Sequence, residues 1–127
     1  MFIEIDFNSD EAIYIQLTNQ IIRGIATSQL KDGEPLPSVR QLAQTIGINM
    51  HTVNKAYTLL RQQGFVSIDR RRGTFICVDM DKLKAMEELK GYLTIALARG
   101  SSKNVTREEI HQLIDEILDE YESCYEA

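Results

Sequence analysis

Three consecutive arginines, Arg70 to Arg72, form the only run of three like charges in the sequence, and short apolar segments flank them. A guanidinium group is always charged in proteins, and its planar fork binds phosphate oxygens in a two-pronged way. Arginine also enters narrow, electronegative minor grooves of DNA. We therefore interpret the run as a DNA contact with no packing role. Two weaker alternatives are a solvated hairpin tip and a protein contact.

A second group of polar residues lies between Asn49 and Thr58. His51, Asn54, Lys55 and Thr58 recur at the spacing of one helical face, and the opposite face is apolar through Val53, Ala56, Tyr57 and Leu60. A helix with one packed face and one polar face near its N-terminus fits the major groove. We expect His51, Asn54 and Lys55 to read bases; a capping or packing role is the alternative for His51.

Short helices joined by a turn must position these side chains. Ser38 and Gln41 have the spacing of a capping box, which specifies a helix start, and Gly47 follows as a stop. Asn49 is then the N-cap of the second helix. Beyond that helix the apolar period changes from about 3.6 to about 2, which predicts two strands around the arginines. A helix over residues 11–28 completes a three-helix core, so the pattern predicts a winged helix-turn-helix.

The C-terminal part predicts two amphipathic helices. The first begins with Met80 and runs for about five turns, residues 100–104 form a loop, and Thr106 with Glu109 has capping-box spacing at the start of the last helix. So short a pair leaves apolar surface exposed, so we expect it to pack against the same pair of a second chain. A small-molecule pocket between the helices is the alternative. The expected dimer contacts are Leu83, Met86, Leu89, Leu93, Ile110, Leu113, Ile114, Ile117, Leu118 and Tyr121.

The net charge of −5 hides a strong polarity along the 127 residues. Residues 35–76 contain six Lys or Arg and one acid, a net of +5, whereas residues 80–127 contain six bases and eleven acids, a net of −5. The local basic field, not the total charge, attracts a polyanion. No apolar run is long enough for a membrane span and no leader pattern is present, so we expect a cytoplasmic protein.

Other residues that could do chemistry have weaker patterns. Cys77 and Cys124 do not make a disulfide framework, and we interpret both as unpaired thiols. Glu108, His111 and Asp115 share a helical face and could hold a divalent cation, but exposed acidic faces are common and we expect no metal. The tail contains no nucleophile with a paired base and no phosphate-binding loop. We therefore expect no cofactor and no enzymatic activity.

The first 76 residues resemble the GntR family of bacterial transcription regulators. The resemblance rests on Leu36 to Arg40 with Leu42 and Ala43, on Thr52, Val53 and Lys55 to Tyr57, on Leu60 and Gly64, and on Gly73 to Phe75. The short helical tail resembles the YtrA-type subfamily. The resemblance implies a dimer that binds operator DNA through Arg40, residues 49–54 and the wing arginines Arg70 and Arg71.

Three positions depart from the family pattern. Ala12 stands where proline is frequent, Met50 where arginine or proline is frequent, and Arg71 where glycine is frequent. Met50 offers only apolar contact, for example with a thymine methyl group, so the operator should differ from those read by an arginine. Arg71 makes the wing stiffer and more highly charged.

These inferences combine into one hypothesis. We predict a mainly α protein with a small β-hairpin wing, in which residues 1–79 form a winged helix-turn-helix DNA-binding domain and residues 80–127 a helical dimerisation region. The homodimer would repress transcription from a palindromic operator. Whether a small molecule acts as its effector is left open. The alternative is a winged-helix protein interaction module that does not act on DNA. The expected DNA contacts are Ser38, Arg40, Asn49, Met50, His51, Thr52, Asn54, Lys55, Arg70, Arg71, Arg72 and Gly73.

Overall fold

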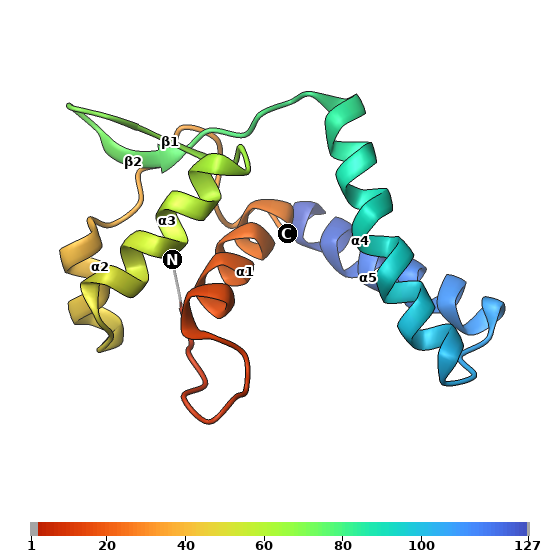
Figure 1. Ribbon diagram of the computed structural model, residues 1–127. Helices are drawn as coiled ribbons and strands as arrows, with labels where there is room; N and C mark the ends of the chain where they lie inside the picture. Colours follow the sequence, from red (N-terminus) through yellow and green to blue (C-terminus); the bar gives the residue numbers. More distant parts are fainter. Residues whose placement is uncertain (1–2, 127) are drawn as a thin grey trace. The chain divides into compact units, whose positions relative to one another are not determined.

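The computed structural model describes residues 3–126, which form five helices and one antiparallel pair of strands (Figure 1). The described chain divides into two compact units, one ending at Asp79 and the other beginning at Met80. The prediction of a mainly α fold with a small β wing is confirmed. The elements are α1 Ile13–Ala26, α2 Val39–Ile46, α3 Met50–Gln62, β1 Val66–Asp69, β2 Gly73–Ile76, α4 Lys82–Ser102 and α5 Arg107–Glu126.

Helix α3 is the centre of the first unit, because it packs against α1, α2 and β1. Leu17 and Ile21 of α1, Val53 and Leu60 of α3, and Ile76 of β2 are fully buried between these elements. Burying each such side chain contributes about 1.5–3 kcal/mol of hydrophobic stabilisation. The apolar stripes that the sequence predicts for α1 and α3 are therefore the faces that form the core.

Local hydrogen bonds fix the ends of α2 and α3. The amide of Gln41 donates to Ser38 Oγ at 3.1 Å and the amide of Ser38 donates to Gln41 Oε1 at 3.2 Å, so the predicted capping box is confirmed. Gly47 ends α2 at φ +82°, where a residue with a side chain is strained. Asn49 caps α3, and its Oδ1 accepts from the amide of His51 at 2.7 Å.

Residues 33–36, which precede α2, lie alongside β2 and form backbone hydrogen bonds with it. The amide of Gly33 donates to the carbonyl of Ile76 at 2.7 Å, and the amide of Ile76 donates to Glu34 at 2.8 Å. The amide of Leu36 then donates to the carbonyl of Thr74 at 2.8 Å. The base of the hairpin is consequently tied to the connection between α1 and α2, and its position in the first unit is fixed.

The second unit consists of α4 and α5, and the chain reverses between them (Figure 1). Asp81 caps α4, its side chain accepting from the amide of Lys84 at 3.2 Å, so Met80 precedes the helix. The expected loop at residues 100–104 is too long, because α4 continues to Ser102. The helix ends where Asn104 adopts φ +66° and the amide of residue 105 donates to the carbonyl of residue 100 at 3.1 Å.

The start of α5 is specified as the sequence predicts. The amide of Thr106 donates to Glu109 Oε1 at 2.9 Å and the amide of Glu109 donates to Thr106 Oγ1 at 3.2 Å, which completes a capping box. The hydrogen bond from the Thr106 amide lowers the pKa of the Glu109 carboxyl. Within residues 3–126, no helix combines the length and the apolar character that crossing a bilayer requires.

Candidate nucleic-acid interface

The first turns of α3 present a polar surface. Asn49, Met50, His51, Asn54 and Lys55 are exposed, and Thr52 is half-buried. Val53, Ala56 and Tyr57, on the other side of the same helix, are buried in the core. Met50 opens the helix with 46% of its surface exposed, which places an apolar side chain in the middle of this polar surface. The helix thus has the two-faced geometry that a groove-binding element needs.

Lys55 is held by a residue of α1. Its ammonium nitrogen lies 4.0 Å from the centroid of the Tyr14 ring, an arrangement in which the cation is attracted to the π face. Tyr14 is half-buried at the edge of the core. The ring therefore fixes where the Lys55 charge lies on the surface. The sequence gives no signal for this pair, because only the packing of α1 on α3 brings the two residues together.

The start of α2 is fixed relative to α3 by Tyr57. The Tyr57 hydroxyl donates to the carbonyl of Pro37 at 2.8 Å, and the side chain is buried with 5% of its surface exposed. Burial raises the pKa of Tyr57, so the hydroxyl stays protonated and remains a donor. Pro37 immediately precedes Ser38, the N-cap of α2, and Arg40 lies exposed in the first turn of that helix. Tyr57 thereby orients two of the predicted DNA-contacting residues.

The wing is a tight hairpin with the arginines at its end. In the strand register Ile68 faces Thr74 and Asp69 faces Gly73, which leaves Arg70 to Arg72 as a three-residue loop. Gly73, the first residue of β2 after this loop, has φ +66°, a conformation that favours glycine. Within residues 3–126, the side chains of Arg70 and Arg71 make no hydrogen bond or ion pair. Both are exposed.

Arg72 behaves differently from its two neighbours. Its Nε donates to Asp69 Oδ2 at 3.0 Å, and its guanidinium carbon lies 3.8 Å from the centroid of the Phe75 ring. The expectation that the arginine run has no packing role is therefore wrong for Arg72. The reason is the hairpin itself, which brings the residues three positions before and after Arg72 onto its side chain.

Asp69 organises the loop through its carboxylate. Oδ1 accepts from the amides of Arg71 at 2.8 Å and Arg72 at 2.6 Å, while Oδ2 holds the Arg72 side chain. The hydrogen bond from the Arg72 amide, followed by that from its side chain, lowers the pKa of the Asp69 carboxyl. The carboxylate is thus ionised at neutral pH. Sequence reasoning missed this residue, although its spacing of three from Arg72 was a signal.

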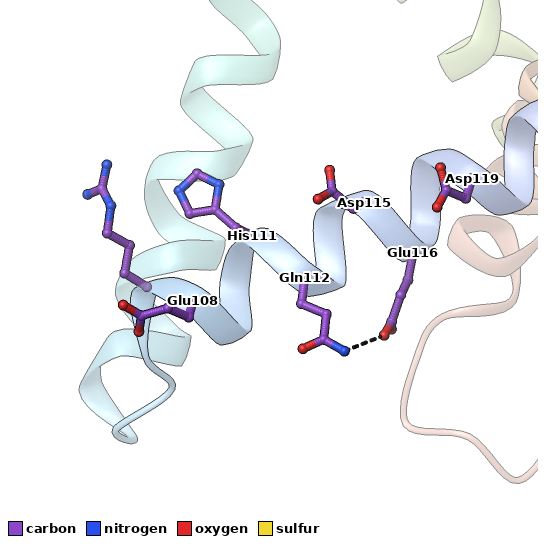
Figure 2. Close-up of a pocket in the computed structure, with 7 residues that line it drawn as sticks. Glu108, His111, Gln112, Asp115, Glu116 and Asp119 are labelled. Carbon is purple, nitrogen blue, oxygen red and sulfur yellow. Dashed lines mark hydrogen bonds between the residues drawn. The ribbon is translucent and has the colours of Figure 1, made fainter.

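The acidic face of α5 forms a shallow, open depression (Figure 2). Every residue that lines it comes from this one helix, and its one internal hydrogen bond in Figure 2 joins Gln112 Nε2 to Glu116 Oε1 at 3.1 Å. Among the residues that the structure describes, no three His, Cys, Asp or Glu side chains are grouped to hold a metal ion. The depression therefore resembles a solvated helix face rather than a ligand site.

The structure describes the side chain of one of the two cysteines. Cys77 is an exposed free thiol directly after β2. The side chain of Cys124 lies outside the described residues.

The apolar stripes of the second unit are open to solvent. No described side chain of this unit is buried, and Leu83 is 79% exposed. The half-buried members of the predicted dimer contacts are Ile110, Ile114 and Tyr121, whereas the exposed ones are Leu83, Met86, Leu89, Leu93, Leu113, Ile117 and Leu118. Exposed apolar surface on this scale is typical of a helix pair that packs against another chain.

Comparison with known proteins identifies the class to which this architecture belongs. Residues 10–76 match the sequence profile described as "Bacterial regulatory proteins, gntR family". The chain is 35% identical over 122 residues to the HTH-type transcriptional repressor YtrA of Bacillus subtilis, covering 91% of each chain. It is 33% identical over 109 residues to the HTH-type transcriptional regulator YhcF of the same organism, covering 82% of this chain and 88% of YhcF.

A solved structure agrees with both. The crystal structure of a transcriptional antiterminator from Listeria monocytogenes EGD-e superimposes with a TM-score of 0.84 at 32% identity, covering 95% of this chain and 92% of the other. The likeness to these proteins extends beyond the profile match into the helical tail, as the YtrA-type resemblance predicts. The chain therefore belongs to the gntR family of bacterial regulatory proteins, and within that family it is YtrA-like.

Proposed function

We propose that the protein is a repressor that binds a palindromic operator as a homodimer. The observation that carries the proposal is the wing loop, in which Arg70 and Arg71 are exposed and have no side-chain partner among residues 3–126, in the same compact unit as the polar first turns of α3. In this arrangement α3 lies in the major groove and the wing contacts the flanking backbone or minor groove. The chain resembles the repressor YtrA of Bacillus subtilis over most of its length, and this resemblance supports repression rather than activation.

The residues of the interface have different tasks. His51, Asn54 and Lys55 contact base edges, and exposed Met50 offers an apolar surface to a thymine methyl group. Contacts to phosphate position the protein on the duplex and carry no sequence information. Residues of this second kind are Ser38, Arg40, Asn49, Thr52, Arg70, Arg71 and Gly73, whereas the guanidinium of Arg72 is already paired with Asp69.

The helices α4 and α5 are the proposed dimerisation region. Their exposed apolar residues, Leu113 and Ile117 among them, become buried when two copies pack about a two-fold axis. Two heads related by that axis match an inverted repeat whose half-site centres lie about one helical turn, roughly 34–36 Å, or a multiple of it apart. The proposal places the protein in the cytoplasm and requires neither a cofactor nor a catalytic group.

Selection of bound duplexes from a random DNA pool tests the proposal. The purified protein should enrich an inverted repeat, and Arg40→Ala should weaken binding to it. Arg61→Ala is the matched control, because Arg61 is an exposed arginine in the last turn of α3, away from the capped end. Affinity for the selected site should fall steeply with salt, because each neutralised phosphate releases counterions. If no sequence is enriched even at low salt, DNA binding is refuted and the protein interaction module takes its place.

A further inference from the structure

The wing loop is held in shape by a single carboxylate. Asp69 accepts hydrogen bonds from two backbone amides of the loop, at 2.8 and 2.6 Å, and from the Arg72 side chain at 3.0 Å. A carboxylate that accepts from the amides two and three positions ahead closes an Asx-type turn. These three contacts define the path of the loop between β1 and β2.

The same contacts separate the three arginines into two groups. The charge of Arg72 is paired with Asp69, and its guanidinium is stacked on Phe75, which is 8% exposed. Arg70 and Arg71 have no such partner within the described residues. The loop therefore offers two available cations on a backbone that is already ordered.

We propose that Asp69 is a positioning residue for DNA binding. It orders the wing loop and holds Arg72 as an internal anchor of that loop, so that Arg70 and Arg71 face the phosphates. This inference rests on the proposed function, because it concerns how the wing acts on operator DNA. Ordering the loop in advance lowers the entropy that is lost when DNA binds.

A simple charge argument predicts the opposite sign. A carboxylate near a polyanion is repelled, so removing Asp69 should tighten binding if charge alone matters. If Asp69 positions the loop, its removal should weaken binding, although one negative charge has gone. The direction of the change in affinity therefore separates the two explanations.

The first arm of the experiment measures the affinity of the full chain for a selected operator duplex. Asp69→Ala should weaken binding by about tenfold, which corresponds to ordering roughly one further residue of the loop on the DNA. Asp69→Asn should recover most of the loss, because an amide oxygen still accepts from the loop amides. Asp10→Ala is the matched control for loss of one exposed acid in the same unit. Unchanged or tighter binding by Asp69→Ala overturns the proposal.

The second arm compares the arginines by the salt dependence of binding. Arg70→Ala and Arg71→Ala should each reduce the slope of log K against log salt by about 1, as expected for loss of a phosphate contact. Arg72→Ala should weaken binding and leave the slope close to that of the wild type. A slope lowered by about 1 in Arg72→Ala identifies Arg72 as a phosphate contact and overturns its role as an anchor.

The third arm needs no DNA. Hydrogen exchange of the Arg71 and Arg72 amides should be faster in Asp69→Ala than in the wild type, because both amides lose their acceptor. Unchanged exchange overturns the ordering of the loop. If the wild-type protein fails to bind any duplex, the proposed function itself is refuted, and that outcome is distinct from a wild type that binds while Asp69→Ala binds equally well.

Discussion

The hydroxyl of Tyr57 provides a sharp test of how the helix-turn-helix is held together. It joins α3 to the residue before α2 through a 2.8 Å hydrogen bond to the carbonyl of Pro37. Tyr57→Phe removes this bond and leaves the ring in the core. A net hydrogen bond contributes about 0.5–1.5 kcal/mol, so the free energy of unfolding should fall by about 1 kcal/mol. For a unit of this size that corresponds to a decrease in Tm of about 4–8 °C.

Tyr57→Ala separates the hydroxyl from the ring. The side chain is only 5% exposed, and truncating a buried aromatic residue costs about 3–5 kcal/mol. Urea denaturation with a fluorescence or circular dichroism readout measures both variants. Tyr92→Phe is the matched control, because Tyr92 is 68% exposed and its substitution should change the free energy of unfolding by less than about 0.5 kcal/mol. If Tyr57→Phe is as stable as the wild type, the hydroxyl does not hold the two helices together.

The same residue predicts a dependence of stability on alkaline pH. Burial raises the pKa of Tyr57 above the value of about 10 that a tyrosine has in the unfolded chain. The folded state therefore keeps a proton that the unfolded state loses as pH rises above about 10. The contribution of Tyr57 is fully present below that pH and is lost above it. Tyr57→Phe should lose less stability than the wild type between pH 9 and 11, roughly the range where unfolded tyrosine ionises, and parallel profiles would contradict this account.

Two further substitutions test the backbone and the tail. Gly64→Ala should lower the free energy of unfolding by about 1–2 kcal/mol, because Gly64 has φ +81° and an added Cβ would lie 2.9 Å from Asp79 Cβ. Gly91→Ala, in open space on α4, is its control in denaturation experiments and should be neutral or stabilising; equal losses would argue against backbone strain. Ile117→Glu should shift the protein from dimer to monomer in sedimentation equilibrium, whereas Gln112→Glu, which adds the same charge to α5, should remain dimeric. A dimeric Ile117→Glu would exclude this face as the interface.

The positions of the helices and the capped starts of α2, α3 and α5 were determined by local sequence. Ser38 with Gln41 and Thr106 with Glu109 form their capping boxes within one helical turn, and Asn49 caps α3 by accepting from the amide of His51. Interactions over three or four residues depend only on backbone geometry that the helix itself provides. The apolar stripes of α1 and α3 followed from the same periodicity, so the core and the two-faced character of α3 were predictable.

The contacts that orient the candidate interface required the tertiary structure. The contact of Lys55 with the Tyr14 ring and the hydrogen bond from Tyr57 to the Pro37 carbonyl each join residues far apart in the sequence. The hydrogen bonds between residues 33–36 and β2 likewise form only because folding brings these two segments together. Packing alone decides such pairs.

Arg72 shows the limit most clearly. Its partner Asp69 is only three residues away, yet the sequence equally allows a solvated guanidinium or one bound to phosphate. The choice depends on the loop conformation, which the register of β1 and β2, the left-handed Gly73 and the buried Phe75 ring set together. The sequence alone therefore determined that cations lie at the wing. The tertiary structure decided which of these cations are available to a ligand. Arg72 is not available, because folding places the Asp69 carboxylate and the Phe75 ring against its guanidinium group.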